Sequence, residues 1–502
     1  MAEKVILKNK GLHALREMNP RLASYNVEFA EVTGGTFWKA YTPGQIAGTE
    51  EFYVKPSDGG IESMYGDLMQ VYPPIDLYNK KVRKLAKDLG PAWVRVSGTW
   101  ATKTYYDFDG TTNGVVPEGY LNVLTKEQWI GVLDFVKEIG GKLIVSVANC
   151  PGLHTAEEPW TPKEAEKLFA LSKEYGVPIE AAEFTNEPNT MEETGFPKGY
   201  TAEHYRRDQD LFFAWLKEHY PECICVGPSS TGGDIAFGKG GGVEQLSSEC
   251  CTCADLMEGT QIPLDVFSYH YYNGGSERVA SVMPNAHWDV SEANSEEYLQ
   301  VAINFAKVYA PLRDKYVPGA EMWVTESGDA GGGGNTWAST YMDVMRTLNE
   351  LAGFATITNG VIFHNTLASS DYGYLARQVF DPRPNYFAVL LWNRLIGTTV
   401  YDSEEEIRMG AHVYAHSRKD GKEGIAYVVI NNDLENTTTV ELPGEADVYM
   451  LEGENGNMRA TVMTLNGASL VLGENNELPE MNPVKASGSV ALAPGACAFI
   501  LV

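Results

Sequence analysis

The feature that most restricts the fold of this chain is an alternation of short apolar runs with longer amphipathic stretches. Eight runs rich in β-forming residues lie at 25–30, 93–96, 142–147, 180–184, 223–226, 266–269, 322–325 and 360–363. Helix-like stretches follow them: two begin with capping-box sequences, at 125–128 and 161–164, and the last two are expected at 337–352 and 384–395. Strands that are apolar on both faces and are followed by helices are typical of a parallel barrel. The sequence therefore predicts an α/β fold containing a (β/α)8 TIM barrel.

The alternation stops after Gly397. Short strand-like runs then follow one another, separated by Gly, Asn, Asp and Pro, at 412–416, 424–431, 437–442, 447–451, 469–472 and 497–502. Such a pattern without helices is typical of an antiparallel β-sandwich. We therefore predict a catalytic barrel at 21–397 and a β-sandwich at 398–502. The strand-like run 4–7, in the segment 1–20, is expected to join the sandwich.

Two long insertions interrupt the barrel pattern. The first, 31–76, follows the first predicted strand, and the second, 227–262, follows the fifth. Both leave the carboxyl ends of strands, and loops of this length in a compact domain are usually functional. We expect both to overhang the active face.

Charge excludes several kinds of partner. The formal net charge is −28 over 502 residues, whereas nucleic-acid binding requires a basic surface. The same charge opposes tight binding of long polyanions, sulfated polysaccharides included. No apolar run reaches the length of about 18 residues that a membrane helix needs, so no membrane partner is expected. The sequence leaves the oligomeric state open.

The chain start and the cysteines bear on compartment and metal binding. The start lacks the basic and apolar regions of a signal peptide, which predicts a cytoplasmic protein, or a secreted one from which such a peptide was removed. Seven cysteines, an odd number, argue against a disulfide framework. Cys250, Cys251 and Cys253 lie close together, but no second Cys or His pair lies nearby to complete a zinc site. We expect no metal and no cofactor, and the role of these three cysteines stays open.

Two glutamates lie where predicted barrel strands end. Glu187 follows the run 180–184, and Pro188 turns the backbone there because proline cannot continue a paired strand. Glu326 ends the run 322–325 and precedes the glycine-rich loop 331–334. Catalytic side chains gather at the carboxyl ends of barrel strands. Two carboxyl groups there are what glycoside hydrolysis requires.

The neighbours of these glutamates suit a retaining mechanism, in which the carboxyl groups lie about 5–5.5 Å apart. Glu187 must be protonated at rest, and we expect the negative charge of Glu326 to raise its pKa. Asn186 could hydrogen-bond the 2-hydroxyl of the sugar. Tyr271 could donate to Glu326 or could simply pack at the barrel top. His270 could orient its neighbours or be a buried histidine with ordinary partners.

The chain resembles glycoside hydrolase family 79, the heparanase and β-glucuronidase family, over nearly its whole length. The motifs that carry the resemblance are Arg95-Val96-Ser97-Gly98-Thr99, Asn186-Glu187-Pro188-Asn189, Val226-Gly227-Pro228, His270-Tyr271-Tyr272, Glu326-Ser327-Gly328, Asp371-Tyr372-Gly373 and Phe380-Asp381-Pro382. The tail, with Leu465-Asn466-Gly467, resembles the sandwich of the family.

The resemblance implies roles for individual residues. It makes Glu187 the acid/base and Glu326 the nucleophile. It implies a pocket for the carboxylate of the substrate, formed by the amides of Gly332 and Gly333 together with Tyr372. Glycines permit a close approach, and successive amides can form an anion nest. Glu28 and Thr99 match positions that contact sugar hydroxyls.

The resemblance also has departures that bear on the substrate. Gly331 stands where heparanases carry Tyr, and the basic residues that vertebrate heparanases use against sulfated chains have no clear counterparts. We therefore predict a retaining β-glucuronidase that acts on carbohydrates bearing β-linked glucuronic acid and releases it in an exo mode. The alternatives are a heparanase-type endo-β-glucuronidase, a neutral-sugar β-glycosidase, and a barrel that binds carbohydrate without cleaving it.

Overall fold

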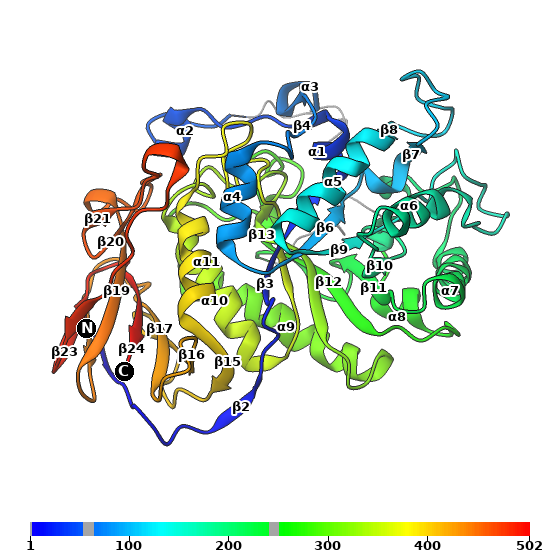
Figure 1. Ribbon diagram of the computed structural model, residues 1–502. Coiled ribbons are helices and arrows are strands. Elements are labelled where there is room, and N and C mark those ends of the chain that lie inside the picture. The colour runs from blue at the N-terminus through cyan, green and yellow to red at the C-terminus, as the bar shows by residue number, and fades with distance from the viewer. Residues whose placement is uncertain (1–2, 54–64, 240–249) are drawn as a thin grey trace.

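The computed structural model describes residues 3–53, 65–239 and 250–502. In this part of the chain eight parallel strands form a closed barrel (Figure 1). In chain order they are β3 (Ala23–Glu28), β6 (Trp93–Ser97), β9 (Lys142–Val145), β10 (Ala181–Glu183), β11 (Ile224–Thr231), β12 (Val266–Gly275), β13 (Met322–Gly331) and β14 (Ile362–His364). Each predicted run overlaps one of these strands, so the predicted α/β barrel is confirmed.

Three barrel strands are longer than predicted. β11, β12 and β13 continue past their apolar runs into residues that looked like loop. The added polar side chains find partners inside the barrel; Ser229 Oγ, for example, lies 2.7 Å from Ser268 Oγ. Polar residues can therefore continue a buried strand when they are hydrogen-bonded.

Helices surround the barrel. The main ones are α4 (Lys80–Leu89), α5 (Lys126–Ile139), α6 (Lys163–Glu174), α7 (Ala202–His219), α9 (Glu296–Tyr316), α10 (Met342–Ile357) and α11 (Pro384–Leu395). The capping box predicted at Thr125 is present at the start of α5. The one predicted at Thr161 is wrong: α6 begins after Pro162 without a side-chain cap, and Glu164 instead forms an ion pair with Lys167 at 2.9 Å.

Excursions follow three barrel strands. After β3 come α1 (Phe29–Thr33), β4 (Gly35–Trp38), α2 (Pro43–Ala47), α3 (Tyr65–Leu68) and β5 (Met69–Tyr72), and residues 54–64 of this predicted insertion lie outside the described ranges. Figure 1 shows the described elements above the end of the barrel at which its strands terminate. The sequence did not predict the paired strands β7 (Thr104–Asp107) and β8 (Asn122–Thr125). The second predicted insertion contains α8 (Cys253–Met257), and residues 240–249 lie outside the described ranges.

The described C-terminal strands, together with two strands of the N-terminal segment, form two sheets that pack as a sandwich. The larger contains β2 (Ala14–Glu17), β15 (Ile396–Tyr401), β16 (His412–Arg418), β17 (Ile425–Ile430), β24 (Cys497–Leu501), β19 (Ala446–Gly453), β20 (Met463–Leu465), β21 (Ala468–Ser469) and β22 (Val484–Ala486). The smaller contains β1 (Lys4–Ile6), β18 (Thr438–Glu441) and β23 (Ser489–Leu492). Val5 and Val440 of the smaller sheet share a buried core with Val413 and Ile500 of the larger.

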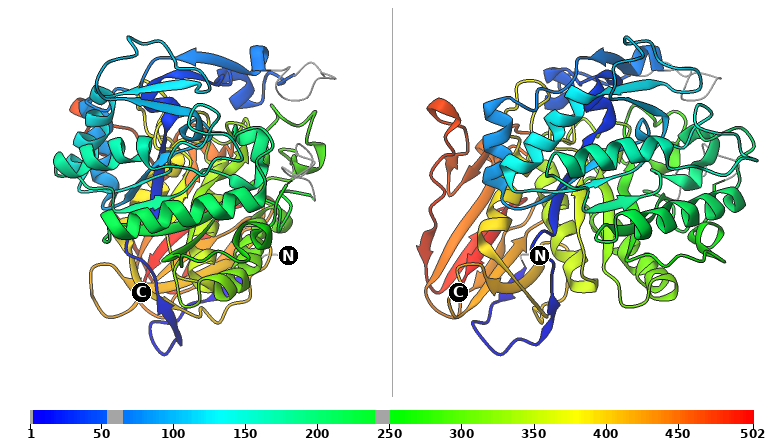
Figure 2. Two further views of the ribbon diagram at one scale, coloured as in Figure 1. Left: turned by 90° about the vertical axis from the view of Figure 1, so that its right-hand side faces the viewer. Right: turned by 45° about the vertical axis from the view of Figure 1, so that its right-hand side comes forward.

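The N-terminal segment and the helices α10 and α11 join the sheets to the barrel. β1 pairs with β18, and β2 pairs with β15. Figures 1 and 2 show the sheets along one side of the barrel, with α10 and α11 between them. Tyr341 donates its hydroxyl to the carbonyls of Leu451 and Gly495, at 2.7 and 3.0 Å. The division into domains at 21–397 and 398–502 stays a prediction.

Two further properties concern the whole described chain. No helix in the described ranges is both long and apolar enough to span a membrane. All seven cysteines are described, and none of them forms a disulfide.

Candidate active site

Glu187 lies on the turn that follows β10. Its backbone is in the left-handed region, with φ +45°, which favours glycine and is strained for other residues. The surrounding chain holds it there: its N–H donates to the carbonyl of Ser229 at 3.2 Å, and the hydroxyls of Thr190 and Thr194 donate to its carbonyl at 3.1 and 2.9 Å. The position of the Glu187 side chain is therefore set by β10, β11 and the turn itself.

Glu326 lies within β13, beside His270 of β12. The ladder is irregular between Tyr269 and His270, and such irregularities redirect side chains. Three groups donate hydrogen bonds to its carboxylate: the Tyr272 hydroxyl at 2.5 Å, a guanidinium N–H of Arg95 at 3.2 Å and the Asn365 amide at 3.3 Å. All three come from barrel strands or the residue that follows one.

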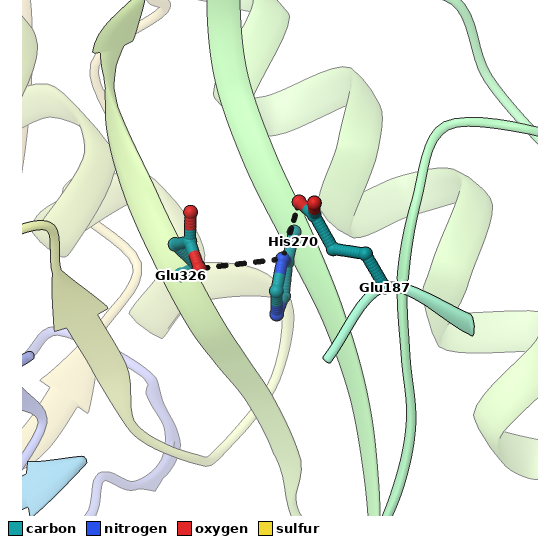
Figure 3. Close-up of side chains that lie close together, drawn as sticks. All are labelled: Glu187, His270 and Glu326. Atoms are coloured by element: carbon teal, nitrogen blue, oxygen red, sulfur yellow. Dashed lines mark hydrogen bonds and ion pairs between the residues drawn. The ribbon is translucent and has the colours of Figure 1, made fainter. Parts of the chain in front are cut away.

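The two carboxyl groups face each other across His270 (Figure 3). His270 Nδ1 lies 2.9 Å from Glu187 Oε1 and 3.7 Å from Glu326 Oε2. One oxygen of each glutamate lies within 4.8 Å of the other. The sequence prediction that these glutamates come together at the barrel mouth agrees with this geometry.

Glu187 has the protonation behaviour of an acid near neutral pH. Burial raises its pKa to about 7, Glu183 raises it further, and the positive charge of Arg95 and a hydrogen bond with Thr231 oppose the rise. Our expectation that the charge of Glu326 causes the shift was wrong, because desolvation is the main cause.

His270 is neutral at this site and donates to Glu187. Burial lowers its pKa to about 4. Its Nε2 lies 3.3 Å from the guanidinium of Arg95, which can only donate, so Nε2 must accept. The single proton of the ring is therefore on Nδ1, which donates to Glu187 Oε1. His270 thus orients a neighbour, the first of the two roles that its sequence allowed.

Arg95 is the buried cation at the centre of the site, and the sequence analysis gave it no role. It donates to Glu183 at 2.7 Å and to Asn186 Oδ1 at 2.7 Å, in addition to Glu326. The hydrogen bond from Arg95 fixes the orientation of Asn186, the residue predicted to bind the 2-hydroxyl. The available signal was an arginine inside an otherwise apolar barrel strand, since buried charges are almost always paired.

The predicted contact of Tyr271 with Glu326 was wrong, because Tyr272 makes it. Successive side chains of a strand point to opposite faces, so His270 and Tyr272 face the barrel interior together. Tyr271 instead faces α9, where its ring packs against Phe305 with centroids 5.2 Å apart.

Three of the residues predicted to bind the sugar are Gly332, Gly333 and Tyr372. Gly332 and Gly333 have φ of +84° and +87°. Tyr372 accepts a hydrogen bond from Asn365 at 3.2 Å and stacks on Tyr272. Asn365, which the sequence analysis missed, thereby joins both tyrosines to Glu326.

Glu28 and Thr99 differ from each other. Glu28 ends β3 and is buried, and desolvation followed by the charge of Glu326 raises its pKa well above the usual value. This shift favours the protonated form of Glu28 beside the nucleophile candidate. Thr99 lies beyond the end of β6, partly exposed, and within the described residues its side chain makes no hydrogen bond to this cluster.

Glu187, His270 and Glu326 also have the spacing of a possible metal site, with ligand atoms within 4.8 Å of one another. The guanidinium of Arg95 lies against two of them, at 3.2 Å from Glu326 and 3.3 Å from His270. A second cation there would be repelled by this buried positive charge. The donor set therefore suits one protonated and one charged carboxyl group better than a metal.

Comparisons with known proteins give relatives by sequence, although no protein-family model matches the chain. Heparanase-like protein 1 of Arabidopsis thaliana is 24% identical over 82% of this chain and 82% of that protein. Baicalin-beta-D-glucuronidase of Scutellaria baicalensis is 24% identical over 85% of this chain and 83% of its own. Hyaluronoglucuronidase of Hirudo nipponia is 23% identical over 85% and 90%.

Solved structures share the fold. A 4-O-alpha-L-rhamnosyl-beta-D-glucuronidase from Fusarium oxysporum superimposes with a TM-score of 0.62 at 12% identity, over 99% of this chain and 100% of that chain. An alpha-L-arabinofuranosidase from Thermotoga maritima gives 0.59 at 15% identity, over 99% of each chain. At this identity the likeness concerns the fold alone.

Proposed function

We propose that this chain, a glycosidase homologous to the heparanase and glucuronidase proteins of glycoside hydrolase family 79, is a retaining β-glucuronidase. One observation carries the proposal: Glu187, on the turn after β10, and Glu326, within β13, each have a carboxyl oxygen within 4.8 Å of the other. This proximity is closer to the separation of about 5–5.5 Å that retaining enzymes use than to the separation of about 6.5–9.5 Å that inverting enzymes use.

In the first step Glu326 attacks the anomeric carbon. Tyr272, Arg95 and Asn365 direct hydrogen atoms at its carboxylate and aim it. Glu187, with a pKa of about 7, gives its proton to the departing glycosidic oxygen. His270 holds one oxygen of Glu187, which leaves the other for the leaving group.

In the second step Glu187 acts as a base towards water. Once Glu326 is esterified, its negative charge no longer balances Arg95. The positive charge of Arg95 then acts more strongly on Glu187 and lowers its pKa, which favours the carboxylate form. The attack of water on the anomeric carbon releases the sugar with its original configuration and frees Glu326.

The substrate carboxylate is assigned to the loop after β13. Consecutive positive φ angles at Gly332 and Gly333 suit a backbone nest for an anion, and Tyr372 lies close to the nucleophile candidate through Asn365. The names of the relatives support this substrate class, since baicalin-beta-D-glucuronidase and hyaluronoglucuronidase both refer to glucuronides.

Exo action is our preferred mode, with heparanase-type endo cleavage as the alternative. The net charge of −28 supports this choice, because it opposes binding of a sulfated polymer. A neutral-sugar glycosidase is disfavoured by the glycine loop. A non-catalytic barrel is disfavoured because both glutamates are present and lie close together.

A panel of chromogenic substrates tests the proposal. The β-glucuronide should be preferred over the matching β-glucoside by roughly a hundredfold or more in kcat/KM, because donors built for a charged group are left unpaired by the neutral sugar. Tyr372→Phe should narrow this preference. A comparable rate on the glucoside would remove the glucuronidase assignment and favour the neutral-sugar alternative.

A further inference from the structure

Arg278 lies just beyond the end of β12 and is buried, with a side chain only 1% exposed. Its guanidinium donates to four acceptors: the carbonyls of Gly332 at 3.1 Å, Gly334 at 2.9 Å and Lys39 at 2.7 Å, and Asp371 Oδ2 at 2.6 Å. These acceptors come from three separate loops at the barrel mouth. One cation therefore joins the loops that follow β3, β13 and β14.

The contacts determine which way the glycine peptides face. The carbonyl of Gly331 accepts from the Ser276 N–H at 2.9 Å, and that of Gly332 accepts from Ser276 Oγ at 2.9 Å as well as from Arg278. In a trans peptide the N–H points opposite to the C=O. The N–H groups of Gly332 and Gly333 therefore both point away from Ser276, on the same side of the loop.

The next peptides are also fixed. The carbonyl of Gly333 accepts from the Asp371 N–H at 3.1 Å, and the N–H of Gly334 donates to the carbonyl of Ala330 at 3.1 Å. The carbonyl of Gly334 accepts from both Arg278 and the Tyr41 hydroxyl, each at 2.9 Å. The loop thus closes on itself, and two consecutive N–H groups remain aligned for an anion.

The charge of Arg278 is maintained by its surroundings. Burial alone would lower its pKa, but Tyr41, Asp371 and Glu277 outweigh this and raise it. The guanidinium lies over the Tyr41 ring, 3.7 Å from its centroid. The guanidinium is paired with Asp371, so its main effect on an anion in front of the loop is to hold the glycine peptides in place.

We propose that Arg278 is the positioning residue for substrate charge: it holds the Gly332 and Gly333 amides toward the sugar carboxylate without touching the sugar. This rests on the proposed glucuronidase function. A lysine cannot replace it, because one ammonium group cannot supply the planar fork that reaches four acceptors.

The test uses Arg278→Lys and Arg278→Met in the full chain, with kcat and KM measured for matched aryl β-glucuronide and β-glucoside. Small misplacement of a binding group costs on the order of a hundredfold. We expect both variants to narrow the glucuronide preference about 10- to 100-fold, mainly through KM for the glucuronide, with glucoside kcat/KM nearly unchanged. Arg278→Lys should lose nearly as much of the glucuronide preference as Arg278→Met, because lysine keeps the positive charge but not the hydrogen-bonding geometry of the guanidinium.

Two controls separate this role from a general structural one. Arg16 also donates to backbone carbonyls, those of Thr356 and Ile357, but at the end of α10 away from the glycine loop. Arg16→Met should leave the glucuronide preference unchanged. Gly333→Ala alters the loop itself, since its Cβ would lie 2.8 Å from Trp38, and should narrow the preference as Arg278→Met does.

The outcomes distinguish the inference from the function. A folded Arg278→Met enzyme with an unchanged preference, beside a Gly333→Ala enzyme that loses it, would overturn the role of Arg278 and leave the glucuronidase assignment standing. Equal losses on both substrates would also overturn it. A wild-type enzyme without preference for the glucuronide would instead overturn the proposed function.

Discussion

The hydroxyl of Tyr272 donates a 2.5 Å hydrogen bond to Glu326, whereas the adjacent Tyr271 packs on the helix side of the same strand. This difference gives a matched pair of variants. Loss of a hydrogen bond to a charged group costs about 1.5–3 kcal/mol, which is about 10- to 150-fold in rate. Tyr272→Phe should lower kcat by this factor, and Tyr271→Phe should change it only a few-fold. Steady-state kinetics on an aryl glucuronide measure both, and the reverse order would contradict the assignment.

The two glutamates should respond differently to leaving groups. Glu326→Gln should abolish turnover of every substrate, because no nucleophile remains. Glu187→Gln should impair glucuronides with poor leaving groups far more than activated aryl glucuronides, which need little protonation. The comparison requires kcat/KM for a series of leaving groups. Equal losses across the series for Glu187→Gln would show that it is not the acid.

The raised pKa of Glu187 predicts an alkaline limit to activity. Glu187 must carry its proton for the first step, and burial places its pKa at about 7. Activity on substrates with poor leaving groups should therefore fall as pH rises through this value. At pH values below it Glu187 is protonated and does not limit activity. Glu187→Gln should lack this limb in its profile on activated substrates. A variant that keeps the wild-type limb would assign it to another group.

The closeness of Glu187 and Glu326 could be predicted because the carboxyl-terminal parts of barrel strands converge whatever the details of packing. The error of one residue between Tyr271 and Tyr272 has a local cause. The ladder between β12 and β13 is irregular between Tyr269 and His270, and two adjacent tyrosines give no sign of which one faces inward. Which side chain of a strand faces inward depends on its pairing with the neighbouring strand and cannot be predicted from the strand's own sequence.

Other parts of the site could not be predicted because they depend on contacts between distant segments. Arg278 donates to the carbonyls of Lys39 and Gly334. Asn365 donates to the hydroxyls of both Tyr272 and Tyr372. Loop carbonyls carry no sequence signature, so neither role is visible from spacing. The raised pKa of Glu187 likewise follows from burial in the folded site, which no single motif describes.

The mode of attack on polymers is a separate prediction. The net charge of −28 should repel heparan sulfate at long range, so terminal glucuronate should be released while chain length falls slowly. Added salt should change heparan sulfate turnover little or raise it, since screening weakens repulsion. Size-exclusion chromatography follows chain length during the reaction. A rapid fall in length before free glucuronate appears would establish endo action.

The most direct test of the central claim is trapping of the covalent intermediate. A 2-deoxy-2-fluoro-β-glucuronide with an activated leaving group should form the glycosyl-enzyme and release it slowly, because the fluorine disfavours the oxocarbenium-like transition state. Peptide mass spectrometry of the inactivated enzyme should locate one glucuronyl ester on Glu326. An ester on a different residue, or turnover without any adduct and with inversion at the anomeric carbon, would contradict the account.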